Sequence, residues 1–131
     1  MKLSKNFSLE EFTKSVTAEK AGIDNEPNQR QVAKLKAICE DILQPLRDAL
    51  GKPITITSGY RCQKLNELIG GTENSQHQDG EAVDFWCDNL EWAFGWIQEH
   101  APDYDQLIWE KGRWLHLSYT RNRKQVLFVK K

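Results

Sequence analysis

The chain has 131 residues, which is room for one domain spanning residues 1–131. Its 18 lysines and arginines nearly balance its 19 aspartates and glutamates, and the formal charge of −1 excludes a nucleic-acid partner held by bulk charge. A hydrophobic content of 39%, with five tryptophans and five phenylalanines, excludes a disordered chain, and the absence of a long apolar run excludes membrane insertion.

The N-terminal seven residues lack the apolar core of a secretion signal, which predicts synthesis in the cytoplasm. The cysteines are Cys39, Cys62 and Cys87, with no closely spaced pair. An odd number without such a pair argues against a disulfide framework, so we expect reduced thiols. We also expect the protein to be a monomer.

The first half of the chain is predicted to be mainly helical. A capping box over residues 8–11 predicts a short helix, and the polar residues 22–28 predict a loop. A longer helix is predicted between Asn28 and Gly51, with Pro45 disturbing its last turns. Its apolar residues recur every three or four positions and are Val32, Leu35, Ile38, Ile42, Leu46 and Leu50.

The second half is predicted to hold most of the strands. A β-branched run at residues 53–57 predicts a strand, which is followed by a turn and a short helix to about Leu68. Residues 70–80 form a long polar loop, and a helix is predicted at residues 89–100. Further strands are predicted at residues 82–86, 106–109, 114–119 and 126–129. Turns are predicted at Lys111-Gly112 and at residues 121–123. The basic residues near the C-terminus are expected to form a solvated tail and are Arg121, Arg123, Lys124, Lys130 and Lys131. This order predicts an α+β fold with a small antiparallel sheet flanked by helices.

Three residues suggest a metal site. Asp84 and His116 lie inside apolar runs, and His77 lies in the polar loop before the Asp84 strand. A carboxylate that points inward must be paired or must bind a metal, and two histidines with one aspartate can hold zinc with a fourth position open. Gly80 would let the loop fold back, and neighbouring strands would bring Asp84 and His116 together. Taken singly, each residue is more often an ordinary hydrogen-bonded side chain, and Asp84 could also cap a turn or pair with Arg61.

Three segments resemble the zinc D-Ala-D-Ala carboxypeptidase family, peptidase family M15, and most of all its small single-domain subgroup from bacteria and their phages. They are SGYR at residues 58–61, S-x-H-x-x-G-x-A-x-D at residues 75–84 and W-x-H-x-S at residues 114–118, and the resemblance covers residues 5–120. It implies zinc held by His77, Asp84 and His116. It also implies a peptidase that hydrolyses an amide bond in peptidoglycan stem peptides or crossbridges, of the D-Ala-D-Ala carboxypeptidase or endopeptidase type. Such an enzyme would act on the cell wall after lysis or export.

The resemblance also suggests roles around the metal. It implies that Arg61 lies close by, where its planar fork would bind a substrate carboxylate or a developing oxyanion. The alternative is a structural ion pair between Arg61 and an aspartate. Ser75 would either orient His77 or the substrate, or close the loop on its own backbone. One of Trp109 and Trp114 is expected to line the substrate cleft, with Trp114 our choice; the remaining tryptophans are expected to lie in the core.

One position departs from the family pattern. Many relatives carry an acidic general base three residues before the last histidine ligand, and that position is Arg113 here. We predict that Glu110 replaces it, with Asp79 and Glu81 as other candidates. The alternative for Glu110 is a surface salt bridge with Lys111 or Arg113. Because this acid is missing, an alternative function is that the protein is a non-catalytic module, which binds cell wall or peptide and retains the fold and the metal site.

Overall fold

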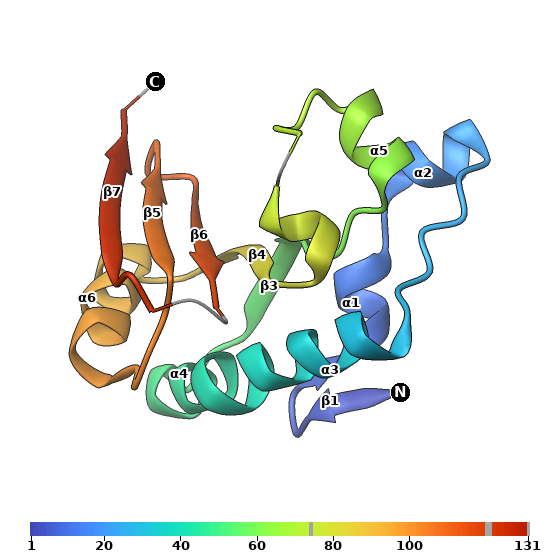
Figure 1. Cartoon of the computed structure of the whole chain (residues 1–131). Coiled ribbons are helices and arrows are strands. Elements are labelled where there is room, and N and C mark those ends of the chain that lie inside the picture. The colour runs from blue at the N-terminus through green and yellow to red at the C-terminus, as the bar shows by residue number, and fades with distance from the viewer. Residues whose placement is uncertain (74, 120–121, 131) are drawn as a thin grey trace.

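The computed structural model describes residues 1–73, 75–119 and 122–130, and shows a sheet flanked by short helices (Figure 1). The strands are β1 (Lys2–Ser4), β2 (Phe7–Ser8), β3 (Ile54–Ser58), β4 (Ala82–Cys87), β5 (Gln106–Glu110), β6 (Trp114–Ser118) and β7 (Gln125–Val129). The helices are α1 (Leu9–Thr13), α2 (Val16–Ala21), α3 (Gln29–Ile38), the π-helical η1 (Cys39–Leu43), α4 (Gln44–Leu50), α5 (Gln63–Leu68), the 3-10 helix η2 (Gln76–Asp79) and α6 (Leu90–His100).

The main sheet has the strand order β3-β4-β6-β5-β7 and confirms the predicted α+β class. The pairs β3-β4, β4-β6 and β5-β6 are antiparallel, as expected, but β7 runs parallel to β5. β6 runs antiparallel to β5 and ends beside the start of β5, and the short connection after Ser118 brings the chain to Gln125 at that same end of the sheet. Because β7 lies next to β5 and not next to β6, it runs parallel to its neighbour, and two hydrogen bonds from Arg123 to the buried Asp105 carboxylate join the starts of the two strands. The predicted turn and basic tail lie partly outside the described residues, which omit Arg121 and Lys131.

One face of the sheet packs into the core and the other stays open. Alternate side chains of each strand point to opposite faces, so Asp84 and His116 share the open face. Figure 1 shows α6 beside the β5–β7 end of the sheet, and α1, α2 and α5 beside the β3 end. The core face joins side chains of α3, η1, α4 and α6 and carries Val83, Phe85, Cys87, Leu107, Leu115 and Leu117.

The longest predicted helix is present as three segments, α3, η1 and α4. Asn28 caps it, since Asn28 Oδ1 accepts the Gln31 backbone N–H at 2.8 Å, and it ends at Gly51 in a left-handed conformation. Proline offers no N–H and crowds the preceding turn. The wide π-helical turn of η1 lies directly before Pro45, which confirms the expected disturbance. No helix among the described residues is long and apolar enough to cross a membrane.

The N-terminal region contains one expected and two unexpected elements. The predicted capping box begins α1, since the Glu11 carboxylate accepts the Ser8 backbone N–H at 2.7 Å. Helix α2 and the β1-β2 pair were not predicted. These elements have between two and six residues, too few for an apolar period to be recognised in the sequence.

The three cysteines are free thiols, as expected. Cys39 and Cys87 are buried, while Cys62 is half-buried. Burial raises the pKa of Cys87 to about 11, helped by the negative charge of Asp88. Burial also raises the pKa of Cys39, so both thiols stay protonated at neutral pH.

Candidate metal centre

Three side chains converge on the open face of the sheet: His77, Asp84 and His116. Asp84 and His116 are direct cross-strand partners on β4 and β6, and His77 comes from η2. Asp84 Oδ1 lies 2.8 Å from His116 Nδ1 and 3.4 Å from His77 Nε2. Ligand atoms of all three residues lie within 4.8 Å of one another. The strand pairing anticipated for Asp84 and His116 is thus present.

His77 is held in one orientation by the backbone around it. Its imidazole is 2% exposed, and Nδ1 lies 2.8 Å from the Gly59 carbonyl oxygen, which can only accept a hydrogen bond. Nδ1 therefore carries a proton, and Nε2 is the ring nitrogen that faces Asp84. Such a backbone hydrogen bond on the distal nitrogen is the usual support of a metal-binding histidine.

Gly80 lets the polar loop turn back into β4. Its φ of +71° lies in the left-handed region, and a Cβ there would lie 2.8 Å from the Gln31 carbonyl oxygen. The first turn of α3 supports the loop from the same side, since Gln31 Nε2 donates to the Gln78 carbonyl at 3.1 Å. Gly80 therefore does what the sequence suggested, because it places His77 and Asp84 beside each other.

The carboxyl group of Asp84 is ionised at neutral pH. Burial opposes its ionisation, but hydrogen bonds from His116 and His77 and the positive charge these rings can carry outweigh burial and hold its pKa well below the usual range. A carboxylate oxygen is a hard donor and an imidazole nitrogen is a borderline donor, and one ionised carboxylate between two imidazoles suits a divalent cation such as zinc. The chemistry of the three donors therefore fits the metal that the sequence suggested.

Arg61 lies half-buried near this set without a carboxylate partner among the described residues. Its Nε atom is buried and has no hydrogen-bond partner, and its terminal nitrogen contacts Ser75 Oγ at 3.5 Å. Burial lowers the pKa of Arg61, and the charge of Asp84 opposes that shift. The structural ion pair between Arg61 and an aspartate is thus not found in the part of the chain described. The guanidinium is therefore available to bind an anion.

Ser75 closes the loop on its own backbone. Its Oγ accepts the His77 backbone N–H at 3.2 Å and thereby caps η2. The same hydroxyl contacts Arg61, whose backbone N–H in turn donates to the His77 carbonyl at 3.0 Å. Ser75 therefore links the segment that carries His77 with Arg61.

Glu110 shares the open face with the metal ligands. It ends β5 directly opposite Trp114, and Trp114 lies two residues before His116 on β6. Paired residues, and residues two apart along a strand, point to one face. A tight turn through Lys111 and Gly112, both with positive φ, joins the strands and leaves Arg113 exposed. The proposed surface salt bridges of Glu110 are not found among the described residues.

The other acidic candidates are placed differently. Glu81 is buried, and its carboxylate accepts from Lys34 Nζ at 2.6 Å. This ion pair occupies Glu81 and joins α3 to the start of β4. Asp79 is exposed at the end of η2.

Two tryptophans flank the ligands on the open face. Trp114 is half-buried beside Glu110, whereas Trp109 points to the core face and packs edge-on against Phe94 at 5.4 Å between ring centroids. Trp86 lies two residues after Asp84 on β4 and is 44% exposed, so the expectation that it belongs to the core is wrong. The strand period could have revealed this, because Asp84 and Trp86 have the same parity.

The fold and these side chains define, within the described residues, a candidate metal centre of two histidines and one aspartate on the open face of an α+β sheet. Comparison with known proteins agrees with this class: the family model described as Peptidase M15 matches residues 5–118. A stretch of 43 residues is 46% identical to the zinc D-Ala-D-Ala carboxypeptidase of Streptomyces albus G. That stretch covers 32% of this chain and only 17% of that relative. The chain belongs to peptidase family M15.

Proposed function

We propose that the protein is a zinc-dependent peptidase that hydrolyses an amide bond in the stem peptides or crossbridges of peptidoglycan. The observation that carries the proposal is the convergence of His77, Asp84 and His116 in a chain of the M15 family. The name of the Streptomyces relative supports zinc and a D-Ala-D-Ala substrate.

The three converging residues would hold the metal. Bound zinc supplies a Lewis acid for the amide carbonyl and lowers the pKa of water toward neutrality. His77 would bind through Nε2, because its Nδ1 is occupied by the Gly59 carbonyl. Asp84 would contribute negative charge, which its lowered pKa maintains across the neutral range.

Glu110 is the residue we assign to proton transfer. Hydrolysis adds a water oxygen to the amide carbon, breaks the C–N bond and requires one proton to reach the leaving amine. A carboxylate can take that proton from water and deliver it to the amine. Glu110 shares the face of His116, and the described residues offer it no salt bridge, which supports this assignment over the ion-paired Glu81.

Arg61 is the residue we assign to substrate binding. Its guanidinium is half-buried, lacks a carboxylate partner among the described residues and borders the same pocket as Asp84. A carboxylate of the substrate would satisfy its free donors and would place the neighbouring amide bond at the metal centre. Trp114, on the face of His116, would provide an apolar wall beside that bond.

Turnover on purified peptidoglycan tests the proposal. We expect the zinc-loaded protein to release D-Ala or new amino groups from sacculi, to lose this activity with a chelator and to regain it with zinc. The Glu110→Gln variant should keep its zinc and lose about 10²- to 10⁴-fold in kcat. Glu91→Gln, an exposed change in the first turn of α6, is the matched control and should leave kcat unchanged. Binding to sacculi without any cleavage would instead identify a non-catalytic module.

A further inference from the structure

Strand β3 has a free edge that borders the metal centre. It is the outermost strand of the sheet and pairs with β4 alone, with Ser58 opposite Asp84. Within the described ranges, no backbone hydrogen bond reaches residues 54–58 from the side away from β4. An edge strand exposes unpaired N–H and C=O groups, which can pair with a further chain.

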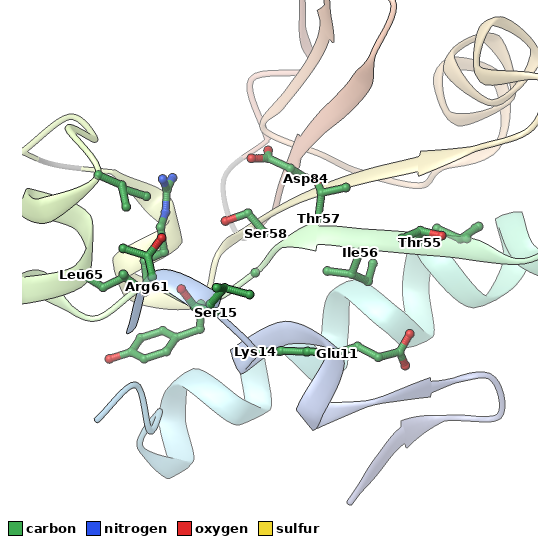
Figure 2. A pocket seen from close by; sticks show the side chains of 16 residues that line it. Glu11, Lys14, Ser15, Thr55, Ile56, Thr57, Ser58, Arg61, Leu65 and Asp84 are labelled. Carbon is green, nitrogen blue, oxygen red and sulfur yellow. The ribbon is translucent and has the colours of Figure 1, made fainter. Parts of the chain in front are cut away.

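A pocket of about 660 Å³ follows this edge (Figure 2). Residues 54–58 form one wall, and the segment from the end of α1 to the start of α2 forms part of the other. Figure 2 shows Arg61 and Asp84 at the same end of the pocket. The volume lies in the range of ligand-binding sites, about 300–1,000 Å³. The free edge is therefore accessible from a cavity that reaches Asp84, one of the three candidate metal ligands.

The protein closes the edge just beyond this pocket. The Tyr60 backbone N–H donates to the Phe12 carbonyl at 2.7 Å, and a Cβ on Gly59 would lie 2.5 Å from that carbonyl oxygen. Helix α1 thus covers residues 59–60 and leaves residues 54–58 open. The open stretch spans four residue steps, or about 13 Å at 3.3 Å per residue, which accommodates about four residues of an extended chain.

Two positive charges line the pocket. Lys14 lies at the end of α1 and Arg61 follows β3, and neither has an ion-pair partner in the described residues. The pocket lining also includes two carboxylates, Glu11, which accepts the Ser8 backbone N–H, and Asp84 of the candidate metal centre. Lys14 and Arg61 are thus the groups of the lining that could pair with carboxylates of an extended peptide.

We propose that the substrate binds as an extended acidic peptide whose backbone pairs with the free edge of β3, and that efficient hydrolysis requires about four residues along this edge. The proposal rests on the peptidase function proposed above. Addition of a peptide strand to a sheet edge is a general mode of recognition, in which backbone hydrogen bonds supply affinity. A dipeptide would reach the metal centre but would leave the edge unpaired.

Synthetic peptides of two to six residues that end in D-Ala-D-Ala test the length requirement. We expect kcat/KM to rise with length and to level off once about four residues occupy the edge. Loss of one backbone hydrogen bond costs about 2- to 13-fold in affinity, so N-methylation of an amide that pairs with β3 should lower kcat/KM by that factor. Equal kcat/KM for the dipeptide and the longer peptides would overturn the proposal.

Hydrogen exchange locates the bound peptide independently of turnover. A pentapeptide with a reduced scissile bond should slow amide exchange at residues 54–58, and D-Ala-D-Ala should not. Residues 125–129 of β7, the other outer strand of the sheet, serve as the internal control. Protection at residues 54–58 without cleavage of any peptide would uphold the edge-binding mode and refute the peptidase function. Cleavage without protection there would refute the edge-binding mode alone.

A charge reversal tests the acidic preference. Lys14→Glu should raise KM for acidic peptides severalfold and leave KM for amidated peptides nearly unchanged. Lys20→Glu, an exposed change on α2 outside the pocket lining, is the matched control and should affect neither. Equal behaviour of the two variants would remove Lys14 from the binding site and overturn the acidic part of the proposal.

Discussion

Replacement of Gly80 by alanine should weaken both the fold and the metal centre. An alanine with the φ of Gly80, +71°, costs about 1–2 kcal/mol relative to a right-handed conformation. Its Cβ would also lie 2.8 Å from the Gln31 carbonyl oxygen, which belongs to the backbone of α3 and cannot swing aside. Relief of this overlap moves η2 or α3 and costs about a further 1–3 kcal/mol.

Gly51→Ala is the matched control for this change. Gly51 has nearly the same φ, +69°, but a Cβ there would meet no atom within 4 Å. Both substitutions restrict the unfolded chain equally, so the difference between them isolates the contact with Gln31. We expect Gly80→Ala to be less stable than Gly51→Ala by about 1–3 kcal/mol, which corresponds to about 4 °C in Tm per kcal/mol.

The metal centre provides a second measurement. Because His77 lies on η2, displacement of this helix should lower zinc affinity in Gly80→Ala by about 10- to 100-fold, the range found for residues that support metal ligands. Gly51→Ala should bind zinc as the unmodified protein does. Urea unfolding of the metal-free proteins and competition with a zinc chelator measure the two effects. Equal stability and equal zinc affinity of the two variants would refute the assigned role of Gly80.

Three further substitutions probe the site and the sheet. His116→Ala should lose zinc and activity together, measured by atomic absorption and turnover, whereas His100→Ala on the exposed end of α6 should keep both. Arg61→Ala should raise KM by about 10- to 150-fold with a smaller change in kcat, and a fall in kcat alone would place the guanidinium at the transition state instead. Asp105→Asn should lower the urea midpoint at neutral pH. Hydrogen bonds from Arg123 lower the pKa of Asp105, so its carboxylate stabilises the fold above the unfolded pKa of about 3.9 and loses this effect as the pH falls below it. The difference in midpoint should therefore shrink below about pH 4, and a constant difference would contradict this explanation.

Much of the fold follows from local chemistry that a sequence displays. Asn28 and Gly51 bound the α3–α4 helix because a capping side chain and a left-handed glycine act within one turn of the chain. The place of β7 could not be predicted, because the alternation of side chains shows which residues share a face of the sheet and does not show which strand lies next to it. β7 lies beside β5 and not beside β6, the strand that precedes it in the chain, and this choice of neighbour makes the pairing parallel.

The metal ligands were suggested for a different reason. Asp84 and His116 are polar residues in apolar strands, and such positions require a partner, but only the resemblance to the M15 family singled out the set that includes His77. Their exact cross-strand alignment depends on the register of β4 and β6, which the sequence could only suggest. The free edge of β3 was beyond prediction, since it depends on which strand lies outermost, whereas the shared parity of Asp84 and Trp86 could have placed Trp86 on the open face.

The state of the cysteines bears on how the metal should be loaded. In the folded chain Cys39 and Cys87 are protonated and enclosed, so they cannot compete with the histidines for an ion. In the denatured chain all three sulfurs are accessible and thiolates bind zinc strongly. Reconstitution after refolding should therefore yield a stoichiometry of one ion per chain, whereas zinc added during refolding would be partly sequestered by sulfur.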